Sequence, residues 1–235
     1  MAEEIGNMWN FPPETKLAAT KANVFKGMYE RFNDSLSTAQ RSLKRTFKRQ
    51  IKDILWLNKL AANTLLLKQG QQTREIQVFA LELTEPELCR DILQQLDKIV
   101  PYYILFILRY QNRRQAIIAY KEFDEEGNVS QVGPYFETGW RAETEPPLEF
   151  KAASSIEELY ANIIRQVAGP ALSYFDTLRS LKENIEVQTQ LESIQAQMDK
   201  LNQKIRKEKQ PKEKHRLFAC KKELEEQKQH LIIDL

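Results

Sequence analysis

Cysteine, glycine and histidine are scarce in this chain of 235 residues, and each scarcity excludes a class of site. Two cysteines, Cys89 and Cys220, are too few for a disulfide framework or a four-thiolate zinc site. The seven glycines never take the spacing that lets backbone amides cradle a phosphate, which excludes Walker and Rossmann nucleotide binding. His215 and His230 both lie in a C-terminal helical segment, so catalysis by a histidine-activated nucleophile is not expected. We expect no metal and no cofactor.

Long apolar runs and a strong net charge are missing too. The longest apolar run, residues 99–108, contains Pro101 and is too short to span a bilayer. Residues 1–5 have neither the basic nor the apolar region of a secretion signal. Lys and Arg total 35 against 33 Asp and Glu, a net charge of +2, so no global field marks the chain as a polyanion binder. These features predict a cytoplasmic protein with no membrane partner.

Three regions differ in their residue pattern. Residues 1–40 form an irregular N-terminal segment, interrupted by Pro12 and Pro13, whose aromatic side chains we expect to pack on the main body. Residues 41–170 have the patterns of a small α+β globular domain. Residues 171–235 have the repeat of a coiled-coil helical hairpin.

The middle region predicts a small, mostly antiparallel sheet with flanking helices. Apolar residues recur at helical spacing from Arg41 to Leu57. Residues 76–83 are apolar at both odd and even positions, which suits a strand covered on both faces. Thr84 has the position of a helix cap, as has Ser154 or Ser155. The expected elements are a helix over 41–57, a strand over 76–83, a helix after Thr84, a hairpin of 102–110 and 115–123, a strand over 135–140 and a helix ended by Gly169.

Two heptad stripes mark the C-terminal region. The first comprises Val187, Leu191, Ile194, Met198, Leu201 and Ile205, and the second Leu217, Cys220, Leu224, Gln227 and Leu231. Pro211 lies between them and costs about 3 kcal/mol inside a continuing helix, which favours an antiparallel hairpin that zips the two stripes together. A continuous coiled coil between chains is the alternative, so homo-oligomerisation through this region stays open.

Basic side chains concentrate in two places, where they can contact nucleic acid or an acidic partner protein. The alternative is a solvated helix face, since neither cluster has the interleaved aromatics that stack unpaired bases. The first cluster comprises Arg41, Lys44, Arg45, Lys48, Arg49 and Lys52. The second comprises Lys200, Lys204, Arg206, Lys207, Lys209, Lys212, Lys214 and Arg216.

A nuclease-like carboxylate set is the best catalytic candidate. Metal-dependent nucleases of the restriction-enzyme type combine an upstream acid with a Glu-x-Lys motif, in which the acids hold the cation and the lysine orients water. Glu149 and Lys151 form such a motif, with Asp124 or Glu137 as the upstream acid. The same motif also occurs at 14–16 and 226–228, so surface charge on an edge strand is the competing interpretation.

Four stretches resemble a known family: Trp9–Thr15, Gln50–Ala61, Leu96–Phe106 and Ile205–Gln210. Together they are similar to the prokaryotic family called domain of unknown function 4391 (DUF4391), and the resemblance extends from Trp9 to Leu231. It implies a stand-alone prokaryotic protein and suggests genes for helicases and DNA methyltransferases of restriction or phage-defence type as neighbours. It supplies no catalytic residues.

We therefore expect a non-enzymatic interaction subunit that contacts a DNA-processing protein partner through the coiled coil, or DNA itself through the basic clusters. The alternative function is a metal-dependent nuclease that uses the Glu149 and Lys151 motif.

Overall fold

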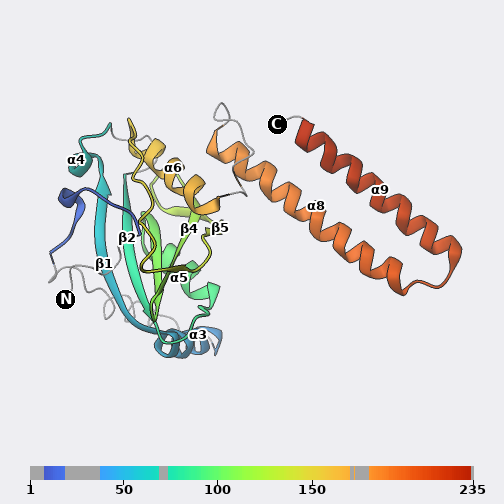
Figure 1. Cartoon of the computed structure of the whole chain (residues 1–235), viewed down its shortest axis with the longest axis horizontal. Helices are drawn as coiled ribbons and strands as arrows, with labels where there is room; N and C mark the ends of the chain where they lie inside the picture. Colours follow the sequence, from blue (N-terminus) through green and yellow to red (C-terminus); the bar gives the residue numbers. More distant parts are fainter. Residues whose placement is uncertain (1–7, 19–37, 69–73, 170–171, 173–179, 234–235) are drawn as a thin grey trace. The chain divides into compact units, whose positions relative to one another are not determined.

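The computed structural model describes residues 8–18, 38–68, 74–169, 172 and 180–233. The chain divides into two compact units, Met1–Ala168 and Gly169–Leu235 (Figure 1). None of the helices in these described ranges is long and apolar enough to cross a membrane.

One mixed sheet forms the centre of the first unit. Its strands lie in the order β1-β2-β3-β4-β5, and the short β6 pairs with β4. Only β2 and β3 run parallel among the described pairs, and α5 makes the crossover that joins them. The predicted α+β class and mostly antiparallel sheet are confirmed. The strands are β1 (Ile51–Ala61), β2 (Glu75–Leu83), β3 (Tyr103–Tyr110), β4 (Arg113–Phe123), β5 (Val129–Glu137) and β6 (Arg141–Ala142), and α5 is Arg90–Ile99.

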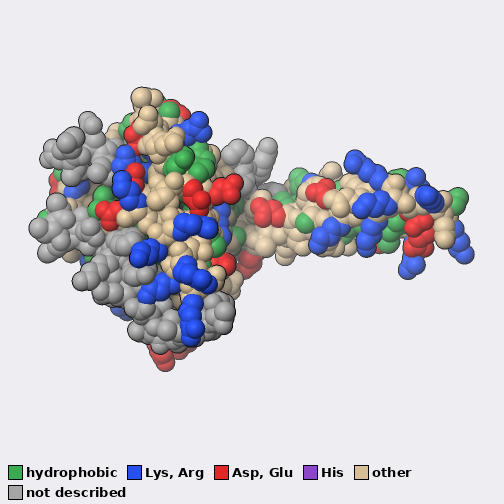
Figure 2. Space-filling model, turned by 90° about the horizontal axis from the view of Figure 1, so that it is seen from below, with side chains coloured by type: hydrophobic (Ala, Val, Ile, Leu, Met, Phe, Trp, Pro, Cys, Tyr) green, Lys and Arg blue, Asp and Glu red, His purple; other side chains and the backbone are tan. Residues whose placement is uncertain are grey.

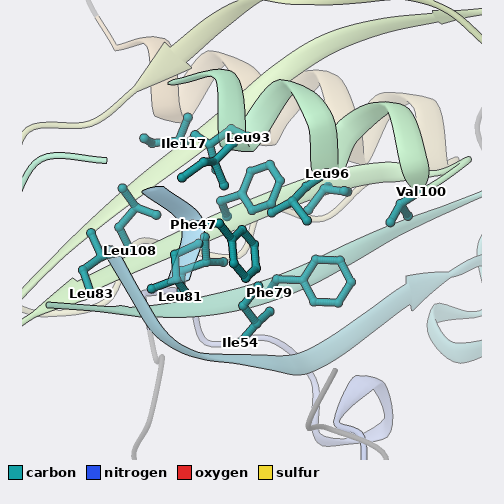
Figure 3. Close-up of a cluster of buried hydrophobic side chains, with 14 residues drawn as sticks. Phe47, Ile54, Phe79, Leu81, Leu83, Leu93, Leu96, Val100, Leu108 and Ile117 are labelled. Atoms are coloured by element: carbon teal, nitrogen blue, oxygen red, sulfur yellow. The ribbon is translucent and has the colours of Figure 1, made fainter. Parts of the chain in front are cut away.

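Helices cover both faces of this sheet. On one face, α5 and α3 (Thr38–Gln50) pack over alternate strand residues, and the buried rings of Phe47 and Phe79 lie in the middle of that core (Figure 3). On the other face, α6 (Ile156–Ala168) packs on β2, β4 and β5, and Tyr160 donates to the main-chain oxygen of Ala119. The residues of β2 are therefore apolar on both parities, as the sequence predicts.

The helix expected over 41–57 is wrong in its second half. Helix α3 ends at Gln50, and residues from Ile51 onward form β1, which pairs with β2 along its whole length. Strand β1 has two irregularities in register, between Ile51 and Asp53 and between Trp56 and Asn58. Each adds a residue that breaks the alternation of a strand, and the apolar positions then fall three and four apart, as in a helix.

The helix cap expected at Thr84 is wrong as well. The helix that follows, α5, begins at Arg90, whereas the Thr84 hydroxyl donates to the main-chain oxygen of Arg49 at 2.5 Å. Gln50 fixes the intervening loop, since its side chain donates to the Glu87 oxygen at 3.1 Å and accepts from the Cys89 amide at 2.9 Å. Residues 84–89 thus hold the end of α3 to the start of α5.

The expected hairpin and last helix of this unit are confirmed. Strands β3 and β4 pair antiparallel as one hairpin. Helix α6 has Ser155 at its start, where the hydroxyl accepts from the Glu158 amide at 3.2 Å, and Gly169 follows its end with φ of +52°. The strand expected over 135–140 is instead β5, which begins at Val129 and ends at Glu137.

Of the expected N-terminal segment, residues 1–7 and 19–37 lie outside the described residues. Met8 and Trp9 are buried, and a single 3-10 turn, η1 (Pro13–Thr15), contacts β1 and the short helix α4 (Ala62–Leu65). The Met8 oxygen accepts from the Leu148 amide at 2.7 Å, which ties this segment to the chain after β6.

The described part of the second unit contains two long helices, α8 (Leu181–Lys207) and α9 (Pro211–Ile233), which fold back on each other as the predicted antiparallel pair (Figure 1). Ser180 and Glu183 close a capping box at the start of α8. Ile194, Met198 and Ile205 of the first predicted stripe are buried.

The second predicted stripe is only partly right. Cys220 and Gln227 are exposed, whereas Lys221 and Lys228 are half-buried beside them. Lys228 reaches across to α8 and donates to the Gln195 side-chain oxygen at 2.8 Å. A lysine can take such a position because its four-carbon stem covers apolar surface while the ammonium stays in water.

Candidate nucleic-acid interface

Helix α3 carries most of its basic side chains away from its buried side, whereas Lys44 is half-buried, about 60° around the helix from Phe47. At 100° per residue, Arg41, Arg45 and Lys48 fall on one side of the helix and Phe47 on the other. All three of these bases are exposed, while Phe47 is fully buried against the sheet. The docking of Phe47 therefore turns the basic side of α3 toward solvent.

Two further bases extend this cluster. Arg49 lies 3.5 Å from the Glu85 carboxylate, an ion pair that leaves both side chains largely exposed, and Lys52 is exposed on β1. Figure 2 views the side on which α3 lies in Figure 1 and shows Lys and Arg side chains gathered there. From Arg41 to Arg49 the helix rises about 12 Å at 1.5 Å per residue. That length matches roughly three to four phosphates of one DNA strand, which follow at 3.4 Å along the axis.

The second basic cluster surrounds the turn between α8 and α9, which we call the hairpin tip (residues 200–216). All eight of its Lys and Arg side chains are exposed. Figure 2 shows Lys and Arg side chains gathered around that end of the helical pair. Two acids lie among them. Glu208 accepts from the amides of Lys209 and Gln210, and Glu213 lies 3.8 Å from Arg216. Most of the positive charge at the tip is thus left uncompensated.

Two of the nuclease candidates are far apart on the sheet. Glu137 ends β5 opposite Ile117, whereas Asp124 follows Phe123 at the other end of β4. Six residues at 3.3 Å each separate Ile117 from Phe123, so the two carboxylates lie about 20 Å apart. Glu137 pairs with Arg90 of α5, and Asp124 accepts from the amide of Asn128 in its own turn, a bond that lowers the pKa of the Asp124 carboxyl.

The Glu149 and Lys151 motif lies on the other face of the sheet from Glu137. The main-chain oxygen of Glu149 accepts from the side chain of Gln166 in α6 at 2.9 Å, and both Glu149 and Lys151 are exposed. Among the described residues, no three His, Cys, Asp or Glu side chains gather where they could hold a metal. The structure does not bring the four nuclease candidates together.

A buried ion pair is the strongest polar feature of the first unit, and the sequence did not single it out. Lys121 of β4 and Asp97 of α5 both have side chains that are 0 % exposed, and Nζ lies 2.8 Å from Oδ1. The same ammonium donates to the main-chain oxygens of Asp97, Val100 and Tyr102 at 2.9, 3.3 and 2.6 Å. Lys121 thus satisfies the carbonyls at the C-terminal end of α5 from within the core.

Tyr135 completes this cluster. Its hydroxyl donates to Oδ2 of Asp97 at 2.5 Å, and burial followed by the nearby Asp97 charge raises the pKa of that hydroxyl well above its ordinary value. Burial also raises the pKa of Asp97 and lowers that of Lys121, and the attraction within the pair opposes both shifts. Because Asp97 and Lys121 are closed from solvent, the pair locks α5 to β4 instead of forming a reactive site. The sequence does carry a signal for buried charges here: Asp97 interrupts the apolar stripe of α5, and Lys121 interrupts that of β4.

A small cavity of about 180 Å³ opens at the end of the sheet, beside the start of β2 and β3. Tyr102, Tyr103 and Phe123 form its aromatic lining, with Arg74 and Glu75 as its charged groups. Both oxygens of Glu75 are engaged, Oε2 by Lys59 at 2.6 Å and Oε1 by Gln77 at 2.8 Å. The cavity therefore offers aromatic walls and the exposed Arg74 guanidinium.

Comparison with known proteins gives one match. A family model described as a domain of unknown function, DUF4391, matches residues 11–227. Neither the curated proteins nor the solved structures contain a match. Any statement on function therefore depends on the surfaces described above.

Proposed function

Because the chain belongs to the DUF4391 family, which has no established function, we propose a function from its surfaces: it is a non-enzymatic accessory subunit that contacts DNA. The observation that carries this proposal is the basic side of α3. Its bases lie on one side of a helix whose other side is anchored in the core by Phe47, so the phosphate-binding surface is held by rigid structure.

The hairpin tip supplies a second surface of the same kind. The two clusters, residues 41–52 and 200–216, together hold fourteen bases and two acids, while the chain as a whole has 35 bases and 33 acids. The rest of the chain therefore has a net negative charge, which favours DNA contact at these two places. Contacts of this kind go to phosphates and carry no sequence information, so we expect binding without sequence preference.

We extend the proposal to a protein partner, a helicase or methyltransferase of a restriction or phage-defence system. The exposed side chains of α9 support a docking role. Phe218 is 49 % exposed and Ile232 is 43 % exposed, and their spacing of fourteen residues, two heptads, puts them on the same side of the helix. The partner would bring the enzymatic activity, and this chain would hold it on DNA.

Charge neutralisation tests the DNA contact. The α3 variant carries Arg41→Gln, Arg45→Gln and Lys48→Gln, and the tip variant carries Lys207→Gln, Lys209→Gln, Lys212→Gln and Lys214→Gln. Each is expected to lower the affinity for a 30-bp duplex about tenfold at 0.1 M salt and to reduce the slope of log K against log salt by about one per phosphate contact removed. Fluorescence anisotropy over a salt series measures both quantities.

A control variant removes three exposed lysines outside the clusters, with Lys68→Gln, Lys98→Gln and Lys222→Gln. We expect this control to bind like the unchanged chain. Equal binding by the unchanged chain, the control and both cluster variants would remove DNA contact from the proposal, and an effect of the tip variant alone would move the contact surface away from α3.

A further inference from the structure

One face of the helical pair is hollowed along most of its length. Toward the tip, a groove of about 350 Å³ is lined by Leu201, Cys220 and Leu224, among others. A second groove of about 450 Å³ continues it past Ile194 and Leu231, and Gln227 borders both. The lining positions on each helix follow one another at intervals of three and four, so the two hollows form one groove on one side of the pair.

The apolar stripes are wider than the contact between the two helices. Cys220 and Gln227 occupy heptad positions, yet both are exposed and line the groove instead of the α8–α9 contact. Leu201, Leu224 and Leu231 are only partly covered. Residues at such positions are buried when each helix has a second neighbour, as in a four-helix bundle.

Helix α8 carries a charge gradient beside this groove. One stripe, at alternating intervals of three and four, passes through Glu183, Glu186, Gln190, Ser193, Gln197, Lys200 and Lys204. It begins with two acids, continues with three uncharged residues and ends with two bases. Five of its members line the grooves: Gln190, Ser193, Gln197, Lys200 and Lys204.

We infer that a second copy of this chain binds in the groove, with the two α8 helices antiparallel and related by a two-fold axis at Ser193. Glu186 precedes Ser193 by seven residues and Lys200 follows it by seven, about 10.5 Å on each side. The two-fold therefore brings Glu186 of one copy beside Lys200 of the other, twice. The same operation brings Gln190 near Gln197 and Glu183 near Lys204, each within one residue, about 1.5 Å, of exact opposition.

This complementarity identifies the occupant. A stripe that is acidic at one end, neutral at its centre and basic at the other end matches its own reverse, which is the requirement of an isologous two-fold interface. A parallel arrangement would instead place acids against acids and bases against bases. The dimer covers Cys220 and Gln227 and buries the partly exposed leucines. It also engages Lys200 and Lys204, so the DNA contact of the tip is left to residues 206–216, where Lys207, Lys209, Lys212 and Lys214 lie beyond the stripe.

Charge exchange in the full chain tests the arrangement, with mass and association followed by sedimentation equilibrium. The unchanged chain is expected to be dimeric. Glu186→Lys places like charges together at two symmetric contacts, and so does Lys200→Glu, so each is expected to raise the dimer dissociation constant by at least about tenfold. The double variant Glu186→Lys with Lys200→Glu restores both contacts and is expected to dimerise like the unchanged chain.

Mixing distinguishes this register from any other. The two single variants, combined in equal amounts, are expected to form a heterodimer in which both contacts are again opposite in charge. Glu192→Lys makes the same charge change about 120° around α8 from Glu186, outside the stripe, and is expected to leave association unchanged. A monomeric unchanged chain at 100 µM, or equal effects of Glu186→Lys and Glu192→Lys, would overturn the inference. Neither outcome bears on the DNA contact, whose variants leave Glu186 and Lys200 unchanged.

Discussion

Replacement of Asp97 with alanine is expected to lower the free energy of unfolding of the first unit by about 3–5 kcal/mol, because it leaves the Lys121 ammonium buried without its counter-charge. Both side chains are 0 % exposed, so water cannot replace the lost carboxylate. The main-chain oxygens of Val100 and Tyr102 stay within hydrogen-bond distance of Nζ but carry no net charge. At about 2–4 °C per kcal/mol for a unit of this size, the midpoint of thermal unfolding should fall by roughly 6–20 °C.

A double-mutant cycle separates the pair from its surroundings. Lys121→Met alone should destabilise by a similar amount, since it strands the Asp97 carboxylate with the Tyr135 hydroxyl as its remaining side-chain partner. The variant with both changes is expected to lose less than the sum, by about 1–3 kcal/mol, because no unpaired charge stays buried. Asp91→Ala, an exposed acid in the first turn of the same helix, should cost less than about 1 kcal/mol. An additive cycle would show that the two charges do not depend on each other.

The pair also shows what the sequence could not predict. Residues 76–83 and the hairpin of β3 and β4 follow from local pattern, because their apolar residues are contiguous and a short polar turn joins the second pair. Asp97 and Lys121 are 24 residues apart and meet only after α5 is laid on the sheet. Nothing in the neighbourhood of either residue indicates that the other will neutralise it.

The prediction of a helix where β1 lies was wrong for a different reason. Its two bulges displace the apolar residues into the spacing of a helix, so the pattern near Ile51 and Ile54 supports either structure. Pairing with β2 selects the strand, because the main-chain groups of β1 find their hydrogen-bond partners there. The basic cluster over residues 41–52 stays a prediction as a contact site, and the side that Arg41, Arg45 and Lys48 share became clear only when the helix was known to end at Gln50.

The helical pair gives a third case. Both Cys220 and Lys221 can follow Leu217 at a heptad interval, and the choice between them is a rotation of α9 by one residue, about 100°. In the single chain Lys221 and Lys228 are half-buried and Lys228 reaches Gln195 of α8, whereas Cys220 and Gln227 line the open groove. The heptad pattern therefore describes the buried side of a larger bundle better than the contact within one chain.

Phe47→Ala is expected to cost about 3–5 kcal/mol of unfolding free energy, and it tests whether the basic side of α3 depends on this anchor. The ring is fully buried among Phe79, Leu81 and other core residues (Figure 3), while Leu43, its neighbour one turn earlier, is only partly buried. Without the ring, α3 keeps the hydrogen bonds of Arg49 and Gln50 at its C-terminal end but loses its fully buried apolar contact with the sheet. Hydrogen exchange in α3 should therefore rise more than in β2 or β3.

Phe47→Ala removes no basic residue. It should therefore weaken DNA binding only because α3 is no longer held in its position on the sheet. We expect the affinity for the duplex to fall about as far as in the α3 neutralisation variant, roughly tenfold, at a temperature where the sheet stays folded. Phe47→Leu retains most of the buried volume, so it should cost less than about 1.5 kcal/mol and bind DNA like the unchanged chain. If Phe47→Ala frees α3 in hydrogen exchange and yet binds DNA with unchanged affinity, the phosphates are recognised by a flexible basic segment, and the role assigned to the core in presenting α3 is wrong.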